Sequence, residues 1–211
     1  MRHQSILFAG SVIVAAALLV SCMTPGPQPG KSIKGKPGIT RSGFLGDYSD
    51  LAISDENKGV LVYLKSPGIL ESYDKFIVDP IEVFLHARSE ADSSGSAEVQ
   101  ELANFFRNEL IEEIEKGGYQ VVQQPGAGVA RFRGAITDVR PGAGLDVGVA
   151  SVEVELLDSQ TRERVAAAMD SKRGRRFFNP KGQTKWGDAK KSFREWAEGF
   201  RRALDKAHAK K

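Results

Sequence analysis

Two stretches of the chain repeat apolar residues at the spacing of a helix. Between residues 97 and 116 they recur at steps of three and four, at Val99, Leu102, Phe106, Leu110 and Ile114, and the stretch stops at Gly117-Gly118. A second series approaches the C-terminus through Trp186, Ala189, Phe193, Trp196, Ala197, Phe200, Ala203, Leu204 and Ala207. Such stripes pack against a core. We therefore expect two amphipathic helices, the second with its aromatic stripe on a sheet.

Shorter apolar stretches separated by turn residues predict strands. They cover residues 60–64, 76–85, 119–124, 129–140, 147–158 and 164–172. In 147–158 the apolar residues Ala150, Val152, Val154 and Leu156 alternate with Ser151, Glu153 and Glu155, so the two sets point to opposite faces of a sheet. Pro80 lies inside 76–85 and has no N–H for a strand ladder, which predicts an edge position or a bulge.

The order of these elements predicts the fold class. The order is β-α-β-β-β-α with hairpin-like connections, which is typical of an α+β layer. We expect a mainly antiparallel sheet with two amphipathic helices packed on one face. Residues 42–211 then form a single α+β domain, and their length is sufficient for one core.

The first residues indicate an export signal. After Met1-Arg2-His3 an almost continuous apolar run extends from Ile6 to Val20, which is shorter than the roughly 20 residues of a membrane span. It ends in Leu19-Val20-Ser21-Cys22, which resembles the bacterial lipobox, and Cys22 is the only cysteine of the chain. That resemblance implies a lipoprotein signal peptide over residues 1–21, cleavage between Ser21 and Cys22, and acylation of Cys22.

Two readings compete with the lipobox. In the first, Cys22 is an incidental cysteine after an ordinary signal; in the second, it belongs to an N-terminal membrane anchor.

If Cys22 is acylated, several acyl chains, at about 0.8 kcal/mol for each buried methylene, would hold the protein on a membrane without a further anchor. The next residue is Met23. Because an Asp at that position usually signals inner-membrane retention, the sorting rules favour the outer membrane, with the domain facing the periplasm.

A Pro- and Gly-rich segment separates Cys22 from the predicted domain. Residues 24–38 hold four Pro and four Gly, together with Lys31, Lys34 and Lys36. Such a composition favours a flexible linker. We therefore interpret residues 22–41 as a lipidated cysteine followed by a basic tether.

Charge is distributed unevenly along the chain. Residues 172–211 carry fourteen Lys or Arg and four Asp or Glu. Residues 47–171 carry eleven Lys or Arg and twenty-three Asp or Glu. One explanation is internal, because the helix at 97–116 holds six Glu and would neutralise the basic last helix beside it. The other is an anionic partner, such as lipopolysaccharide phosphates or peptidoglycan carboxylates, that contacts Lys172, Arg173, Arg175 and Arg176. A periplasmic location excludes nucleic acid as that partner.

The sequence contains no convincing catalytic constellation. It has no Gly-x-Ser-x-Gly motif, and His86 and His208 lack a second ligand at metal spacing and are expected at the surface. Asp74, Asp79 and Glu82 form an acidic cluster, but paired carboxylates hydrolyse glycans only at defined separations. We therefore expect no enzyme, no metal and no cofactor.

Several segments together resemble one family of bacterial lipoproteins. They are the lipobox cysteine, Ser42-Gly43-Phe44-Leu45-Gly46-Asp47-Tyr48-Ser49-Asp50-Leu51, Tyr73-Asp74-Lys75-Phe76-Ile77-Val78-Asp79-Pro80-Ile81, the helix with Leu102 and Leu110 that ends before Gly118-Tyr119, and Phe193-Arg194-Glu195-Trp196-Ala197 with Leu204-Asp205. Over about residues 42–206 the chain is similar to the domain of unknown function 3313 (DUF3313). The resemblance implies an envelope lipoprotein of Gram-negative type and supplies no catalytic residue.

These observations lead to one main hypothesis and two alternatives. The main hypothesis is a lipid-anchored periplasmic binding or adaptor module at the outer membrane, whose partner is an envelope protein complex or an anionic envelope polymer. The first alternative is a structural subunit that self-assembles through exposed strand edges, such as the strand with Pro80. The second is an envelope glycan hydrolase that uses Asp74, Asp79 and Glu82.

Overall fold

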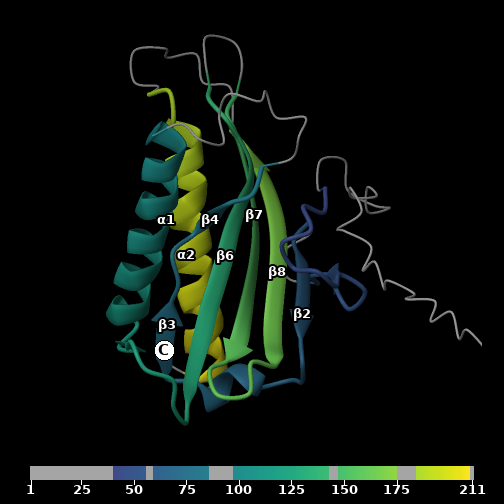
Figure 1. The fold of residues 1–211 in the computed structure, drawn as a ribbon, viewed down its shortest axis with the longest axis vertical. Helices are drawn as coiled ribbons and strands as arrows, with labels where there is room; N and C mark the ends of the chain where they lie inside the picture. Colours follow the sequence, from purple (N-terminus) through teal and green to yellow (C-terminus); the bar gives the residue numbers. More distant parts are fainter. Residues whose placement is uncertain (1–39, 56–58, 86–96, 143–146, 175–183, 210–211) are drawn as a thin grey trace, which may run out of the picture.

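The structure, a computed structural model, describes residues 40–55, 59–85, 97–142, 147–174 and 184–209 (Figure 1). The predicted signal peptide and most of the predicted tether lie outside these residues. The strands are β1 (Ala52–Ile53), β2 (Leu61–Leu64), β3 (Lys75–Val78), β4 (Glu82–Val83), β5 (Gln120–Val121), β6 (Val129–Arg140), β7 (Val149–Asp158) and β8 (Arg164–Arg173). The helices are α1 (Ala97–Lys116), α2 (Gly187–Ala207) and the short 3-10 helix η1 (Ile69–Ser72).

The strands form one eight-stranded sheet in the order β1-β2-β8-β7-β6-β3-β5, and β4 also pairs with β6. Along the path β1-β2-β8-β7-β6 every neighbouring pair of strands is antiparallel. Strands β3 and β4 pair with β6 in parallel, and β5 pairs with β3 in parallel. The α+β class, the mainly antiparallel sheet and the two helices on one face are therefore confirmed. The helices lie side by side on the left of Figure 1, against the sheet.

Helix α1 ends where its sequence predicts an end. Gly118 has a φ of 77°, in the left-handed region that favours glycine. The N–H of Tyr119 there donates to the carbonyl of Ile114 over 3.2 Å. This glycine-dependent turn closes the helix and leads the chain into β5.

Aromatic side chains join the helix pair to the sheet. Phe106 of α1 stacks on Phe193 of α2 at 5.0 Å between ring centroids. Phe200 places its ring against Phe76 of β3 at 5.7 Å and Phe132 of β6 at 5.3 Å. The predicted aromatic stripe of α2 is therefore part of the core.

Ion pairs connect the acidic helix to the basic one. Arg201 of α2 lies 2.7 Å from Glu113 of α1, and Arg194 lies 3.2 Å from Glu109. Lys185, just before α2, pairs with Glu98 at 2.5 Å. The acidic side chains of α1 therefore neutralise part of the basic charge of α2 and of the residues just before it, as the internal explanation of the uneven charge predicted.

Pro80 interrupts its strand, and the prediction of one continuous strand over 76–85 was wrong. The segment divides into β3 and β4, and both pair with β6, at Val78↔Phe132 and Glu82↔Ala135. Strand β3 also pairs with β5, so it is not a free edge. At the interruption the carbonyl of Val78 accepts two hydrogen bonds from the Arg107 guanidinium of α1, at 3.2 and 2.9 Å.

None of the helices in the described part of the chain is long and apolar enough to cross a membrane.

Candidate functional site

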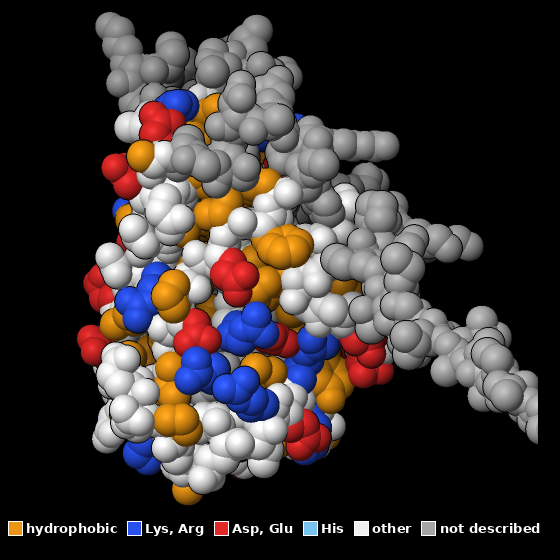
Figure 2. All heavy atoms as spheres, viewed as in Figure 1, with side chains coloured by type: hydrophobic (Ala, Val, Ile, Leu, Met, Phe, Trp, Pro, Cys, Tyr) orange, Lys and Arg blue, Asp and Glu red, His pale blue; other side chains and the backbone are white. Residues whose placement is uncertain are grey.

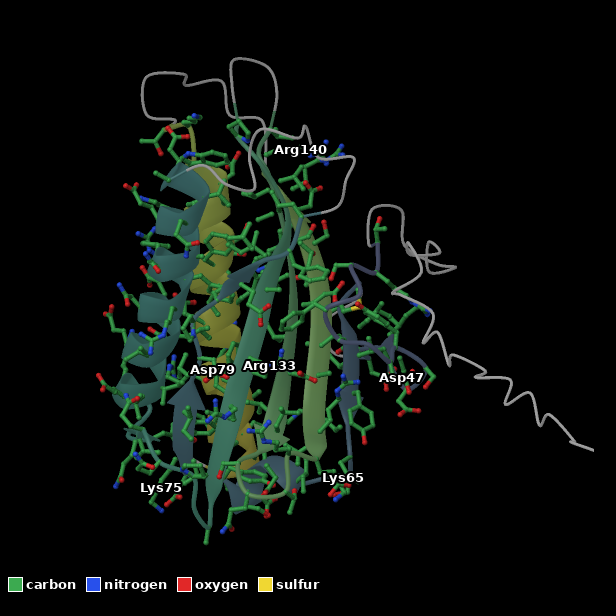
Figure 3. The ribbon with its side chains drawn as sticks, in the orientation of Figure 1. Asp47, Lys65, Lys75, Asp79, Arg133 and Arg140 are labelled. Atoms are coloured by element: carbon green, nitrogen blue, oxygen red, sulfur yellow. The ribbon has the colours of Figure 1, made fainter. Side chains whose placement is uncertain are left out.

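The face of the sheet opposite the helices is covered at one side by residues 42–51, which we call the strap. The strap lies to the right of the sheet in Figure 1, and Asp47 marks it in Figure 3. It adds a second apolar cluster to the molecule. Leu45 and Tyr48 of the strap pack there with Leu61 of β2 and with Ala167 and Met169 of β8.

A buried carboxylate on β7 holds the strap in place. Glu153 is 0% exposed, and its two oxygens accept hydrogen bonds from the Ser42 N–H at 2.7 Å and the Tyr48 hydroxyl at 2.6 Å. Among the described residues no Lys or Arg lies at ion-pair distance from Glu153. Because a buried charge is costly unless it is hydrogen-bonded, these two strap donors are what makes this burial tolerable.

Tyr48 connects Glu153 to the first turn of the strap. Its hydroxyl oxygen accepts the Gly43 N–H at 2.7 Å while its proton goes to Glu153. Gly43 has a φ of 102°, a conformation that strongly favours glycine. Burial, reinforced by the hydrogen bond to Glu153, raises the pKa of Tyr48 to about 12, so the hydroxyl keeps its proton.

A second acidic residue of β7 holds two arginines that also contact the strap. Glu155 lies 2.7 Å from Arg133 of β6 and 2.8 Å from Arg164 of β8. Arg164 donates to the strap carbonyls of Asp47, over 2.8 Å, and of Leu45. Arg133 lies over the ring of Phe44, 5.2 Å from its centroid. Two neighbouring acids on one strand therefore fix the strap, one directly and one through arginines.

The three carboxylates of the hydrolase hypothesis are each paired with a basic side chain. Asp79 accepts two hydrogen bonds from Arg131, at 2.8 and 3.1 Å, and Glu82 lies 3.5 Å from Arg133. Asp79 and Arg133 are labelled near the middle of Figure 3, and Figure 2 shows basic and acidic side chains intermixed in that region.

Asp74 pairs with Lys75 at 3.0 Å, and its side chain is 62% exposed. The hydrogen bond from Lys75 is the main reason that the pKa of Asp74 is lowered. A general acid needs a raised pKa. The arrangement of all three carboxylates is that of ion pairs on a sheet surface.

The predicted anion-binding stretch is only partly within the described residues. Lys172 pairs with Glu195 of α2 at 2.7 Å and lies 5.3 Å from the centre of the Trp196 ring. Arg173 is exposed at the end of β8. Arg175 and Arg176 lie outside the described residues, as do Ser21 and Cys22. Lys172 is therefore already engaged within the fold.

His208 is not the plain surface residue that the sequence suggested. Its ring is partly buried against Tyr119, 5.3 Å between centroids. Its Nδ1 lies 3.0 Å from the carbonyl of Leu204, which leaves Nε2 buried without a hydrogen-bond partner. His86 lies outside the described residues. Across the described ranges no group of three or more His, Cys, Asp or Glu could hold a metal ion.

The strap contacts are the feature that sequence reasoning missed. The alternation in β7 correctly placed Glu153 and Glu155 away from the helices, but it could not show that this second face is also covered. The available signal was the apolar content of the strap, with Phe44, Leu45, Tyr48 and Leu51 in ten residues. That content indicates packing without identifying the surface that it packs on.

Comparisons with known proteins give the family but no activity. No curated protein matches the chain. Solved structures that resemble the chain weakly include these three. A dodecameric PelC variant from Paraburkholderia phytofirmans is 16% identical, with a TM-score of 0.45, over 67% of this chain and 95% of that one. A predicted lipoprotein from Caulobacter crescentus is 14% identical, with a TM-score of 0.41, and the match covers 68% of this chain and 98% of that one.

A minor lipoprotein from Acinetobacter baumannii is 12% identical, with a TM-score of 0.34, and the match covers 64% of this chain and 92% of that one. These similarities are too weak to bear on function. The family model described as "Protein of unknown function (DUF3313)" matches residues 40–146 and 140–200, which is most of the chain. The chain therefore belongs to the DUF3313 family.

Proposed function

We propose that this protein is a lipoprotein of the outer membrane, anchored through Cys22, whose periplasmic domain is a binding or adaptor module. The observation that carries the proposal is the placement of the single cysteine. It follows a basic start, an apolar run too short for a span and the sequence Leu19-Val20-Ser21. The cysteine-free remainder suits an oxidising periplasm, because it leaves no thiol to cross-link.

The way the domain begins supports an anchor at its N-terminal side. The strap, which lies within thirty residues of Cys22, is held on the sheet by Glu153 and Arg164. A pull on the preceding tether is therefore resisted at a hydrogen-bonded site. Such an attachment suits a chain whose other end is fixed in a bilayer.

Binding is a better proposal than catalysis for this domain. The acidic side chains that could have formed a hydrolytic pair are engaged with Arg131, Arg133 and Lys75. We propose an envelope protein complex as the partner, with an anionic envelope polymer as the second candidate. The exposed Arg173 at the end of β8 is what favours the polymer.

The anchor is tested by substitution of the cysteine and of its neighbour. Cys22→Ser is expected to abolish incorporation of labelled palmitate and to leave an uncleaved precursor. Met23→Asp keeps the cysteine and is the matched control, expected to retain acylation while the protein moves to the inner-membrane fraction. Continued palmitate labelling of the Cys22→Ser chain would contradict the proposed anchor.

The partner is tested by cross-linking the acylated protein in cells. A discrete heterologous band that depends on Cys22 would support an adaptor in a protein complex. If no protein is captured, binding to isolated lipopolysaccharide or peptidoglycan is measured at increasing salt, where screening should weaken an ionic contact. Absence of both kinds of binding would contradict the proposed binding module.

A further inference from the structure

The point at which the tether reaches the domain is fixed on one side of the molecule. Ser42 donates its N–H to Glu153 on the helix-free face of the sheet, and it follows Cys22 by only twenty residues. A Pro- and Gly-containing chain of that length has a mean reach of about 25 Å. An anchor at Cys22 would therefore keep the strap side close to the bilayer.

Two exposed apolar side chains lie on the same side. In the described part of the chain three large hydrophobic residues are exposed: Ile53 (55%), Leu64 (50%) and Phe84 (38%). None belongs to α1 or α2. Ile53 pairs with Leu61, whose side chain packs under the strap, and the ring of Phe84 lies 6.3 Å from that of Phe44 in the strap. Two of the three therefore border the strap, whereas Leu64 pairs with Ala166 and lies on the opposite face of the sheet.

The charge of the tether favours the same orientation. The tether carries Lys31, Lys34 and Lys36 and no acidic residue, and each basic residue near an anionic leaflet contributes about 1 kcal/mol of attraction. The charges on the helix side are mixed, because α1 exposes Glu101, Glu112 and Glu115 whereas α2 exposes Lys190, Lys191 and Arg202. The orientation therefore rests on the tether and on the exposed apolar side chains. The helices and the strap lie on opposite sides of the sheet (Figure 1).

We infer that the strap side of the sheet, with Ile53 and Phe84 at its border, rests on the lipid surface that holds the anchor. The helix pair then points away from the bilayer and is the side available to other envelope components. This inference rests on the proposed lipid anchor at Cys22 and adds an orientation to it.

The orientation is tested with fluorescent labels on the acylated full chain in vesicles of phosphatidylethanolamine and phosphatidylglycerol. Acylation blocks the sulfur of Cys22, so one introduced cysteine at a time can be labelled. Ile53→Cys reports the strap side, and Glu112→Cys is the matched position on the outer side of α1; both positions are exposed. The two sides are separated by a sheet and a helix, about 20 Å. Lipids with a nitroxide headgroup quench the label that lies nearer.

We expect the label at position 53 to be quenched several-fold more than the label at position 112, while a water-soluble nitroxide quenches both alike. Equal quenching by the lipids, or stronger quenching at 112, would overturn the orientation and leave the anchor intact. The same labels on a chain that begins at residue 22 and carries Cys22→Ser, and so has neither signal peptide nor acyl groups, separate the two ideas. If that chain binds the vesicles as well as the acylated one, the lipid anchor fails, whatever the labels report about orientation.

Discussion

The strap is held by so few polar contacts that removal of one hydroxyl should loosen it measurably. Tyr48→Phe deletes the donor at 2.6 Å from Glu153 and the acceptor of the Gly43 N–H at 2.7 Å, and it leaves the aromatic ring in place. The carboxylate of Glu153, which is 0% exposed, then keeps only the Ser42 N–H of its two strap donors.

The expected cost follows from the charge of the acceptor. A hydrogen bond to a charged group contributes about 1.5–3 kcal/mol, and a buried partner left unpaired costs a similar amount. We therefore expect the free energy of strap release to fall by about 2 kcal/mol, which corresponds to roughly a thirtyfold change in the population of the released strap.

Two measurements on a chain that begins at residue 22 and carries Cys22→Ser read out this change. Urea unfolding gives the global free energy, and amide hydrogen exchange at Ser42 and Gly43 gives the local one. Exchange at both amides is expected to accelerate roughly thirtyfold. Tyr63→Phe is the matched control, because Tyr63 packs against the same apolar cluster and its hydroxyl makes no hydrogen bond within the described residues.

The reasoning is refuted if Tyr48→Phe and Tyr63→Phe have the same effect on both measurements. Equal effects would mean that the strap is held by its apolar residues alone and that Glu153 is satisfied in another way. A large global loss with unchanged exchange at Ser42 would also contradict it, because the strap would then not open separately from the rest of the domain.

Three further predictions concern the rest of the fold. Arg201→Met should lower the free energy of unfolding by about 1–2 kcal/mol in urea, because Glu113 loses an ion pair at 2.7 Å; no loss would mean that this pair is solvated. Gly174→Ala should destabilise the folded domain by about 1–3 kcal/mol, because the added Cβ would lie 2.1 Å from Oδ2 of Asp188. Gly126→Ala is the control, because its added Cβ would meet its nearest neighbour at an ordinary 3.7 Å. Equal thermal midpoints for the two variants would contradict the close packing at Gly174. Burial is the main cause that raises the pKa of three tyrosines to about 12, above their ordinary 10.0. Their stabilising contribution is therefore complete below pH 10 and lost as the pH rises to about 12. The folded Tyr63→Phe chain contains only these three tyrosines, and tyrosinate absorbance that appears in it near pH 10 would refute this.

Periodicity along the chain was sufficient to predict the helices and the long strands. Residues 97–116 and 129–140 are α1 and β6 with the predicted bounds, because each has a continuous apolar pattern of one period. The opposite charges of the two helices also predicted that α1 lies beside α2, and the ion pair of Arg201 with Glu113 at 2.7 Å is one contact between them. These features follow from residue order with little tertiary information.

The strap and the parallel strands could not be predicted in the same way. Ser42 and Tyr48 meet Glu153 across 111 and 105 positions of the chain, and no local pattern encodes a contact at that separation. Pro80 indicated a disturbance in its strand, but a lone proline does not reveal that the strand divides and continues beside β6. The position of each of these segments is decided by the surface that the rest of the fold offers.

The most direct test of the lipid anchor is the mass of the mature N-terminal peptide isolated from membranes. The account predicts that the chain begins at Cys22 and that this residue carries a diacylglyceryl group on its sulfur and an acyl group on its amine. A chain that begins elsewhere, or an unmodified Cys22, would contradict the anchor and the orientation that follows from it.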